Sequence, residues 1–159
     1  MVRLWGTGHG LFWVDAYAQR YETLSTFNTC NLAQIDGKIY AIQNLAHLSS
    51  FEGKLLMIDK QKGKWRLETV TEFKQPFWMF IQDGKRFITL NEKAVYSLNL
   101  KGQVRELYRF MEDTRIGNML VLSNHEIWLG CDRSLLHLTP QRDDAYQAQW
   151  YIPENPKIR

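Results

Sequence analysis

Cysteine, proline and long apolar runs are all scarce in this chain of 159 residues. Its two cysteines, Cys30 and Cys131, lie far apart and form no Cys-x-x-Cys pair, so their spacing supports neither a zinc site nor a redox motif. Nowhere do eighteen apolar residues follow one another, and the first residues lack the apolar stretch of a signal peptide. We therefore expect a soluble, cytoplasmic protein that carries no metal or other cofactor.

An excess of charge of one sign is also missing. The chain has 20 basic and 17 acidic residues, a net charge of +3 at pH 7, and the two signs are mixed along it. Proteins that bind nucleic acid usually gather positive charge on one face, and membrane anchors usually form a basic block. The basic segment 60–66, which contains Trp65, has the composition of a nucleic-acid patch, but lysines at a sheet edge commonly prevent aggregation. We therefore expect neither nucleic acid nor a membrane as the partner.

Aromatic residues, by contrast, are abundant, with six Trp, seven Tyr and eight Phe. Together with β-branched residues and few prolines, they favour a sheet protein over a helical bundle. Apolar residues do not recur with the helical period over any window longer than a turn. The length suits one domain that can bury its own core. The composition thus predicts a single all-β domain over residues 1–159.

The chain repeats itself with a period near 40 residues. Residues 77–90 align with residues 117–130, which places Met79 on Met119 and Phe87 on Ile127, at an offset of 40. Residues 35–40 align with residues 82–87 at an offset of 47, and Leu4-Trp5 aligns with Ile127-Trp128. The alignment predicts repeats at about 1–27, 28–73, 74–113 and 114–152, with a tail at 153–159. A period of about 40 residues is typical of propeller blades with four antiparallel strands each.

Turn residues divide each repeat into short strands. In the third repeat we expect strands at 78–82, 86–91, 94–99 and 104–110, separated in part by Asp83-Gly84 and Lys101-Gly102. Glycine at such a place supplies the positive φ of a tight hairpin. The first repeat begins at its second strand, because nothing precedes Leu4 that matches residues 119–122. About fifteen strands are therefore expected.

The first repeat also resembles a known family. Leu4-Trp5-Gly6-Thr7, Gly10-Leu11 and Asp15 are similar to the W-x-G-T-x-x-G-L-x-x-x-D signature of propeller blades in the ectodomains of bacterial two-component sensors. Residues 127–136 are a weaker copy, while Tyr40 and Phe87 stand where the signature has Trp. The resemblance implies a β-propeller fold and a general tendency to bind partners. Fold alone does not determine function.

The way in which the ring closes is left open by the sequence. Four repeats can close as an unusually small ring, or two chains can join as a homodimer into a larger one. A third reading is that the chain is a fragment of a longer propeller.

A catalytic constellation is not evident in the sequence. No two of the four histidines stand at ligand spacing, and His125-Glu126 lacks the second His of a metalloprotease helix. The glycines at 6, 8 and 10 lack the third glycine of a dinucleotide fingerprint. Cys131 has no base near it in sequence, and no Gly-x-Ser-x-Gly motif occurs. We therefore expect a protein that is not an enzyme.

The lengths of the connections point to one end of the molecule. In an up-and-down sheet the connections alternate between two ends, so the tight turns share one end and the longer connections share the other. Long loops on a rigid scaffold commonly carry binding sites. The insertion at 44–52 is partly apolar and either contacts a partner or folds back onto its own sheet. The candidate partner-binding residues are His47, Phe51, Glu52, Lys74, Glu92, Lys93, Glu112, Asp113, Arg115, Asp132 and Arg133.

These observations lead to one main hypothesis. We expect a non-enzymatic, all-β module that binds another protein through the end with the longer connections, for example a bacterial immunity-type protein that occludes a toxin. Occlusion requires a complementary surface and no chemistry. The alternatives are a ligand-sensing or catalytic propeller that uses the centre of the ring, and a fragment of a longer propeller.

Overall fold

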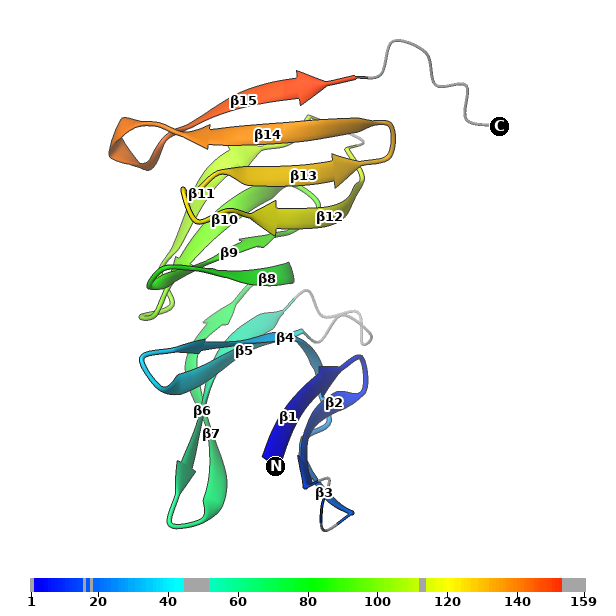
Figure 1. Ribbon diagram of the computed structural model, residues 1–159, viewed down its shortest axis with the longest axis vertical. Coiled ribbons are helices and arrows are strands. Elements are labelled where there is room, and N and C mark those ends of the chain that lie inside the picture. The colour runs from blue at the N-terminus through cyan, green and yellow to red at the C-terminus, as the bar shows by residue number, and fades with distance from the viewer. Residues whose placement is uncertain (1, 16, 18, 45–51, 112–113, 153–159) are drawn as a thin grey trace.

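The computed structural model describes residues 2–15, 17, 19–44, 52–111 and 114–152, and these residues form an all-β structure (Figure 1). Its strands make up four antiparallel sheets, each an up-and-down meander. Sheet 1 contains β1 (Val2–Thr7), β2 (Gly10–Asp15) and β3 (Arg20–Ser25). Sheet 2 contains β4 (Asn28–Ile35), β5 (Lys38–Asn44), β6 (Gly53–Gln61) and β7 (Lys64–Phe73).

The other two sheets follow in chain order. Sheet 3 contains β8 (Trp78–Asp83), β9 (Arg86–Leu90), β10 (Ala94–Asn99) and β11 (Val104–Arg109). Sheet 4 contains β12 (Ile116–Val121), β13 (Ile127–Cys131), β14 (Ser134–Pro140) and β15 (Tyr146–Tyr151), with the short 3₁₀ turn η2 (Arg142–Asp144) before β15. The predicted all-β class and the antiparallel sheets are confirmed.

The first repeat differs from the others. Four strands are expected of a complete repeat and three of the first, which is expected to begin at its second strand, and sheet 1 has three strands within the described residues. The reason is that β1 corresponds to the second strand of the other sheets, since the turn between β1 and β2 matches the turn between β13 and β14. The described chain begins at residue 2, directly at this strand.

Sheets 1 and 2 lie side by side in the lower part of the molecule, and sheets 3 and 4 make up the upper part (Figure 1). The first strands of neighbouring sheets contact each other, β1 with β4, β4 with β8 and β8 with β12. We call the side of a sheet that packs on the preceding sheet its back face, and the side directed toward the following sheet its front face.

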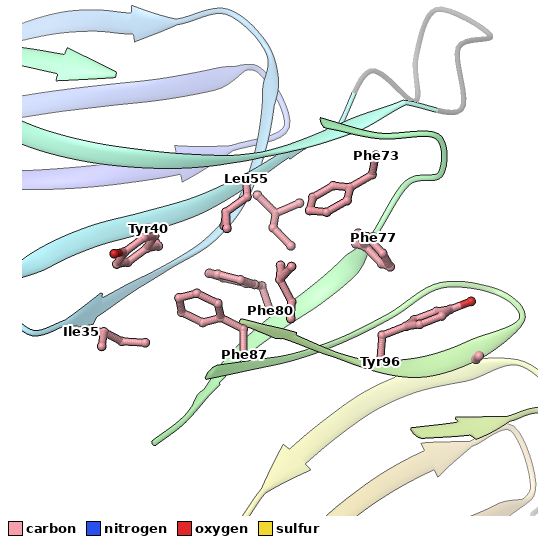
Figure 2. Packing of buried hydrophobic residues seen from close by; sticks show 11 residues of the cluster. Ile35, Tyr40, Leu55, Phe73, Phe77, Phe80, Phe87 and Tyr96 are labelled. Carbon is pink, nitrogen blue, oxygen red and sulfur yellow. The ribbon is translucent and has the colours of Figure 1, made fainter. Parts of the chain in front are cut away.

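Each junction between sheets holds its own apolar cluster. Leu11, Ala41 and Ile58 are buried between sheets 1 and 2, and Ile88, Leu129 and Leu136 are among those buried between sheets 3 and 4. The junction of sheets 2 and 3 is the most aromatic of the three, and its rings are those of Tyr40, Phe73, Phe77, Phe80, Phe87 and Tyr96 (Figure 2). Because side chains alternate along a strand, Tyr40 points toward sheet 3 and the next residue, Ala41, toward sheet 1.

The strand register shifts the predicted alignment of the second repeat by one residue. Phe87 pairs with Leu98 in sheet 3, and the matching pair in sheet 2 is Ile39 with Ile58, so Ile39 rather than Tyr40 corresponds to Phe87. A shift of one residue turns every side chain to the other face. Tyr40 therefore lies on the front face of sheet 2 and Phe87 on the back face of sheet 3, and their ring centroids are 5.4 Å apart.

The cause of this shift is the chemistry of two turns. In sheet 2 the two-residue loop is Asp36-Gly37, with φ of 50° and 77°, as a type I′ turn requires. In sheet 3 the loop is Gly84-Lys85, since Asp83 still pairs with Arg86, and glycine takes the first position as in a type II′ turn.

Two further matches also move by one residue. Ile81 pairs with Ile88 as Leu120 pairs with Trp128, so Phe80 rather than Met79 corresponds to Met119. Leu4 pairs with Trp13 as Trp128 pairs with His137, so Leu4 corresponds to Trp128 rather than to Ile127.

Candidate functional site

The end of the molecule that carries the longer connections is held together by buried amide side chains. The Asn44 side chain, at the end of β5, donates to the Phe77 carbonyl at 2.6 Å and accepts from the Phe77 amide at 3.2 Å. The Asn91 side chain, just after β9, donates to Gln75 Oε1 at 3.0 Å. Because Gln75 and Phe77 both lie between β7 and β8, this connection is fixed to sheets 2 and 3 at the predicted end. A Cβ at position 53 would come within 2.9 Å of Asn44 Oδ1 and 3.2 Å of the Gln75 carbonyl oxygen, so a side chain there would displace the amide network.

A first hollow opens beside this network and has a volume of about 290 Å³. Its lining comes from the ends of β5 and β7 and the start of β6, and the residues are Gln43, Glu52, Gly53, Lys54, Glu72, Phe73 and Lys74. Gln43 is only 2% exposed, and its Nε2 donates to Thr29 Oγ1 at 2.9 Å. Its Oε1 is buried and has no hydrogen-bond partner in the described part of the chain. The hollow therefore combines carboxylates and ammonium groups with an unused acceptor.

A second hollow, of about 280 Å³, lies between sheets 3 and 4 at the same end. It is lined by Trp78, Leu90, Asn91, Glu92, Thr114, Arg115 and Ile116. Trp78 is 41% exposed, and Glu92 and Arg115 are exposed as well. An exposed indole next to an arginine and a carboxylate is the residue combination that dominates the energy of many protein interfaces.

The predicted binding residues fall into three groups: residues that line a hollow, exposed residues that line neither hollow, and residues that the structure does not describe. Glu52 and Lys74 line the first hollow, and Glu92 and Arg115 line the second. Lys93 is exposed in the connection between β9 and β10, and its amide donates to Asn91 Oδ1 at 2.8 Å. Asp132 and Arg133 are exposed in the turn between β13 and β14, next to the start of β12 because Cys131 pairs with Ile116. His47, Phe51, Glu112 and Asp113 lie outside the described residues.

Several residues of the hollows were not among the predicted ones, and those with the clearest bearing on binding are Gln43, Glu72 and Trp78. Each lies inside a strand or at its first residue, whereas the sequence argument searched the connections. Trp78 directly follows the connection 74–77. Its position beside a predicted loop was the one feature of the sequence that could have indicated it as a binding residue.

A polar cluster at the opposite end joins sheets 3 and 4. The Asp83 side chain is 3% exposed; its Oδ2 accepts from Arg86 Nε at 2.8 Å, and its Oδ1 lies 2.5 Å from His125 Nδ1. Arg86 Nη2 donates to the Tyr146 hydroxyl, which in turn donates to the His125 carbonyl. Asp83 and His125 lie at the turns between the first and second strands of adjacent sheets, so the repeat period is consistent with their being neighbours. The sequence analysis did not predict that their side chains form a pair. The cluster fixes the turn of sheet 4 onto sheet 3.

The Cys131 thiol lies half-buried at the end of β13. Burial raises the pKa of the Cys131 thiol, so the nucleophilic thiolate is scarce at neutral pH. Within the described residues, no group of three or more His, Cys, Asp and Glu side chains is arranged to hold a metal ion. No helix of the described chain has the length and apolar character needed to cross a membrane.

Comparisons with known proteins add no further assignment. No protein-family model matches this chain, and no curated protein matches it.

Proposed function

We propose that this chain is a propeller-like, non-enzymatic module that binds another protein through the two hollows at the end with the longer connections. The propeller-like arrangement is supported by the contacts of β1, β4, β8 and β12, which follow one another as the inner strands of successive blades do. Each sheet acts as one blade, and the binding end collects connections from sheets 2, 3 and 4.

The observation that carries this proposal is the unused acceptor of Gln43. A buried polar atom without a hydrogen bond costs stability, on the order of 1–3 kcal/mol, and such atoms commonly serve function. Gln43 lines a hollow that also contains Glu52 and Glu72 beside Lys54 and Lys74, so the site offers acceptors to a donor group together with donors of its own. A lysine, arginine or amide side chain of a partner protein supplies such a donor.

The second hollow contributes a different kind of contact. Trp78 presents an aromatic surface at low cost in conformational entropy, since it is already held at the start of β8. Arg115 and Glu92 flank it with opposite charges. The first hollow then orients the partner through hydrogen bonds, while the second contributes the exposed indole of Trp78.

Within this class of protein, an immunity-type inhibitor fits the arrangement best. An inhibitor of this kind covers the active site of a toxin with a rigid complementary surface and needs no reactive group of its own. Its place of action would be the cytoplasm, as the sequence predicts.

The proposal is tested with a tagged chain that captures its partner in the native host, followed by calorimetric titration of the purified pair. Gln43→Met is expected to weaken binding at least about tenfold. The melting temperature is expected to fall by only a few degrees, because the change removes the hydrogen bond to Thr29 Oγ1 together with an acceptor that has no partner. Trp78→Ala with Arg115→Ala is expected to weaken binding by about tenfold or more.

The matched control is Lys101→Ala with Val104→Ala, which removes two exposed side chains at the opposite end and is expected to leave the affinity unchanged. A partner that binds both site variants as tightly as the native chain would disprove the assigned surface. A small molecule that raises the melting temperature when no protein partner is found would favour a ligand sensor instead.

A further inference from the structure

Sheet 3 shows what a sheet of this protein looks like when both of its faces are covered. Ile88, Leu90 and Val95 lie on its front face, packed against sheet 4, and each is at most 1% exposed. Phe87 and Leu98 lie on its back face, packed against sheet 2, and both are 0% exposed. Apolar residues of both faces are thus buried by the neighbouring sheets.

Sheet 4 carries the same pattern on its front face, but no sheet of the described chain covers it. The register matches Trp128 to Ile88 and Leu135 to Val95. Leu135 is 47% exposed, and on the same face Leu120 is 55% and Tyr151 is 41% exposed. The front face of sheet 4 therefore has the apolar residues of a buried face, but no sheet of the described chain packs on it.

The aromatic side chains of this face form a layer of stacked rings. The Trp128 ring stacks on His137 with centroids 3.9 Å apart and planes 10° apart, and it lies 5.6 Å from the Tyr151 ring. His137 Nε2 is 3.1 Å from Glu126 Oε2, so the imidazole already has a polar partner. Burial of this layer would thus leave that nitrogen of His137 satisfied.

Sheet 1 has the complementary feature on its back face. Trp5, Phe12 and Val14 lie there, opposite the face that packs on sheet 2. The register matches them to Leu129, Leu136 and Leu138, which are all 0% exposed beneath sheet 3. In sheet 1, however, Trp5 is 53% exposed, and Tyr21, which pairs with Val14, is 75% exposed.

The two uncovered faces are one front face and one back face. Front faces pack on back faces at all three junctions within the chain, and the two open faces belong to the first and the last of the four sheets. We propose that two copies of this chain join, the front face of sheet 4 in each copy packing on the back face of sheet 1 in the other. The pair then forms a closed ring of eight sheets, and propellers typically contain roughly four to eight blades. This inference does not depend on the function proposed for the two hollows at the end with the longer connections.

The proposal predicts which substitutions separate the copies. Leu135→Asp places a charge on the front face of sheet 4, and Trp5→Asp with Tyr21→Asp places charges on the back face of sheet 1. In sedimentation velocity the native chain is expected to have twice the 18.8 kDa mass of one chain, and each variant alone is expected to be a monomer. The matched control, Val104→Asp, changes another exposed apolar residue, 37% exposed, that lies on neither face and should leave the dimer intact.

Mixing the two variants gives the sharpest test and also shows that both are folded. The front-face variant keeps a native sheet 1, and the back-face variant keeps a native sheet 4, so an equimolar mixture is expected to recover a dimer through one native contact. A native chain that remains monomeric up to its solubility limit would overturn the proposal. So would a dimer that survives Leu135→Asp, a mixture that stays monomeric, or open polymers in place of a two-copy ring.

Discussion

Val95 and Leu135 occupy the same position in neighbouring sheets, but Val95 is fully buried while Leu135 is 47% exposed. The two strands have similar sequences because they belong to successive repeats, and only one of them has a further sheet in front of it. The comparison teaches that an apolar pattern indicates that a face of a strand is suited to packing. It does not indicate whether the sheet that covers this face belongs to the same chain. Substitutions that separate covered from uncovered positions test this directly.

The largest difference is expected at the aromatic junction of sheets 2 and 3. Phe87 is fully buried, and its ring centroid lies 4.2 Å from Phe80 and 5.4 Å from Tyr40. Phe87→Ala is expected to lower the free energy of unfolding by about 3–5 kcal/mol, because it removes buried area and leaves a cavity. Leu120→Ala on the uncovered face is expected to cost less than about 1 kcal/mol in the monomer.

Urea unfolding of dilute protein, followed by circular dichroism, measures both values. Equal losses for the two variants would mean that the junction of sheets 2 and 3 is no better packed than the open face.

A smaller difference is expected between a buried and an exposed carboxylate. Asp83→Asn removes the charge that holds Arg86 and His125 across sheets 3 and 4, and it is expected to cost about 2–3 kcal/mol. Asp36→Asn breaks only the pair with Lys85, whose side chains are 63% and 79% exposed, and is expected to cost less than about 1 kcal/mol. Thermal unfolding of the two variants checks the difference, and a cost for Asp36→Asn as large as that for Asp83→Asn would contradict it.

The smallest difference is expected at two turns. Gly84 and Gly102 both have a positive φ, of 61° and 81°, but a Cβ on Gly84 meets open space whereas one on Gly102 comes within 2.3 Å of Thr71 Cγ2 in sheet 2. Both alanine variants carry the backbone strain of about 1–2 kcal/mol. Gly102→Ala is expected to cost about 1–2 kcal/mol more, because it also overpacks the junction. Denaturation midpoints compare the two, and equal costs would show that the turn does not press on sheet 2.

Much of the fold was predictable because it depends on local signals. The strands expected in the third repeat agree with β8 to β11 within one residue at each end, since glycine turns and alternating apolar residues mark them. The face assignment was not predictable at that level. Asp36-Gly37 and Asp83-Gly84 look alike in sequence, yet only the first pair forms the whole loop.

The candidate site was predictable only as a region. The sequence indicated which connections share an end, and the hydrogen bonds of Asn44 and Asn91 do bring those of sheets 2 and 3 together. It did not indicate Gln43 or Trp78, because their exposure depends on how neighbouring sheets pack, and that is a property of residues far apart in the chain.

The most direct test of the account compares two adjacent leucines of β14. Leu136 points to the back face and is 0% exposed, while Leu135 points to the front face and is 47% exposed. In urea unfolding of chains diluted to the monomer, Leu136→Ala is expected to cost about 3 kcal/mol and Leu135→Ala less than about 1 kcal/mol. The cost of Leu135→Ala is expected to rise with protein concentration as copies associate. Equal costs for the two variants in the monomer would contradict the division of each sheet into a covered and an uncovered face.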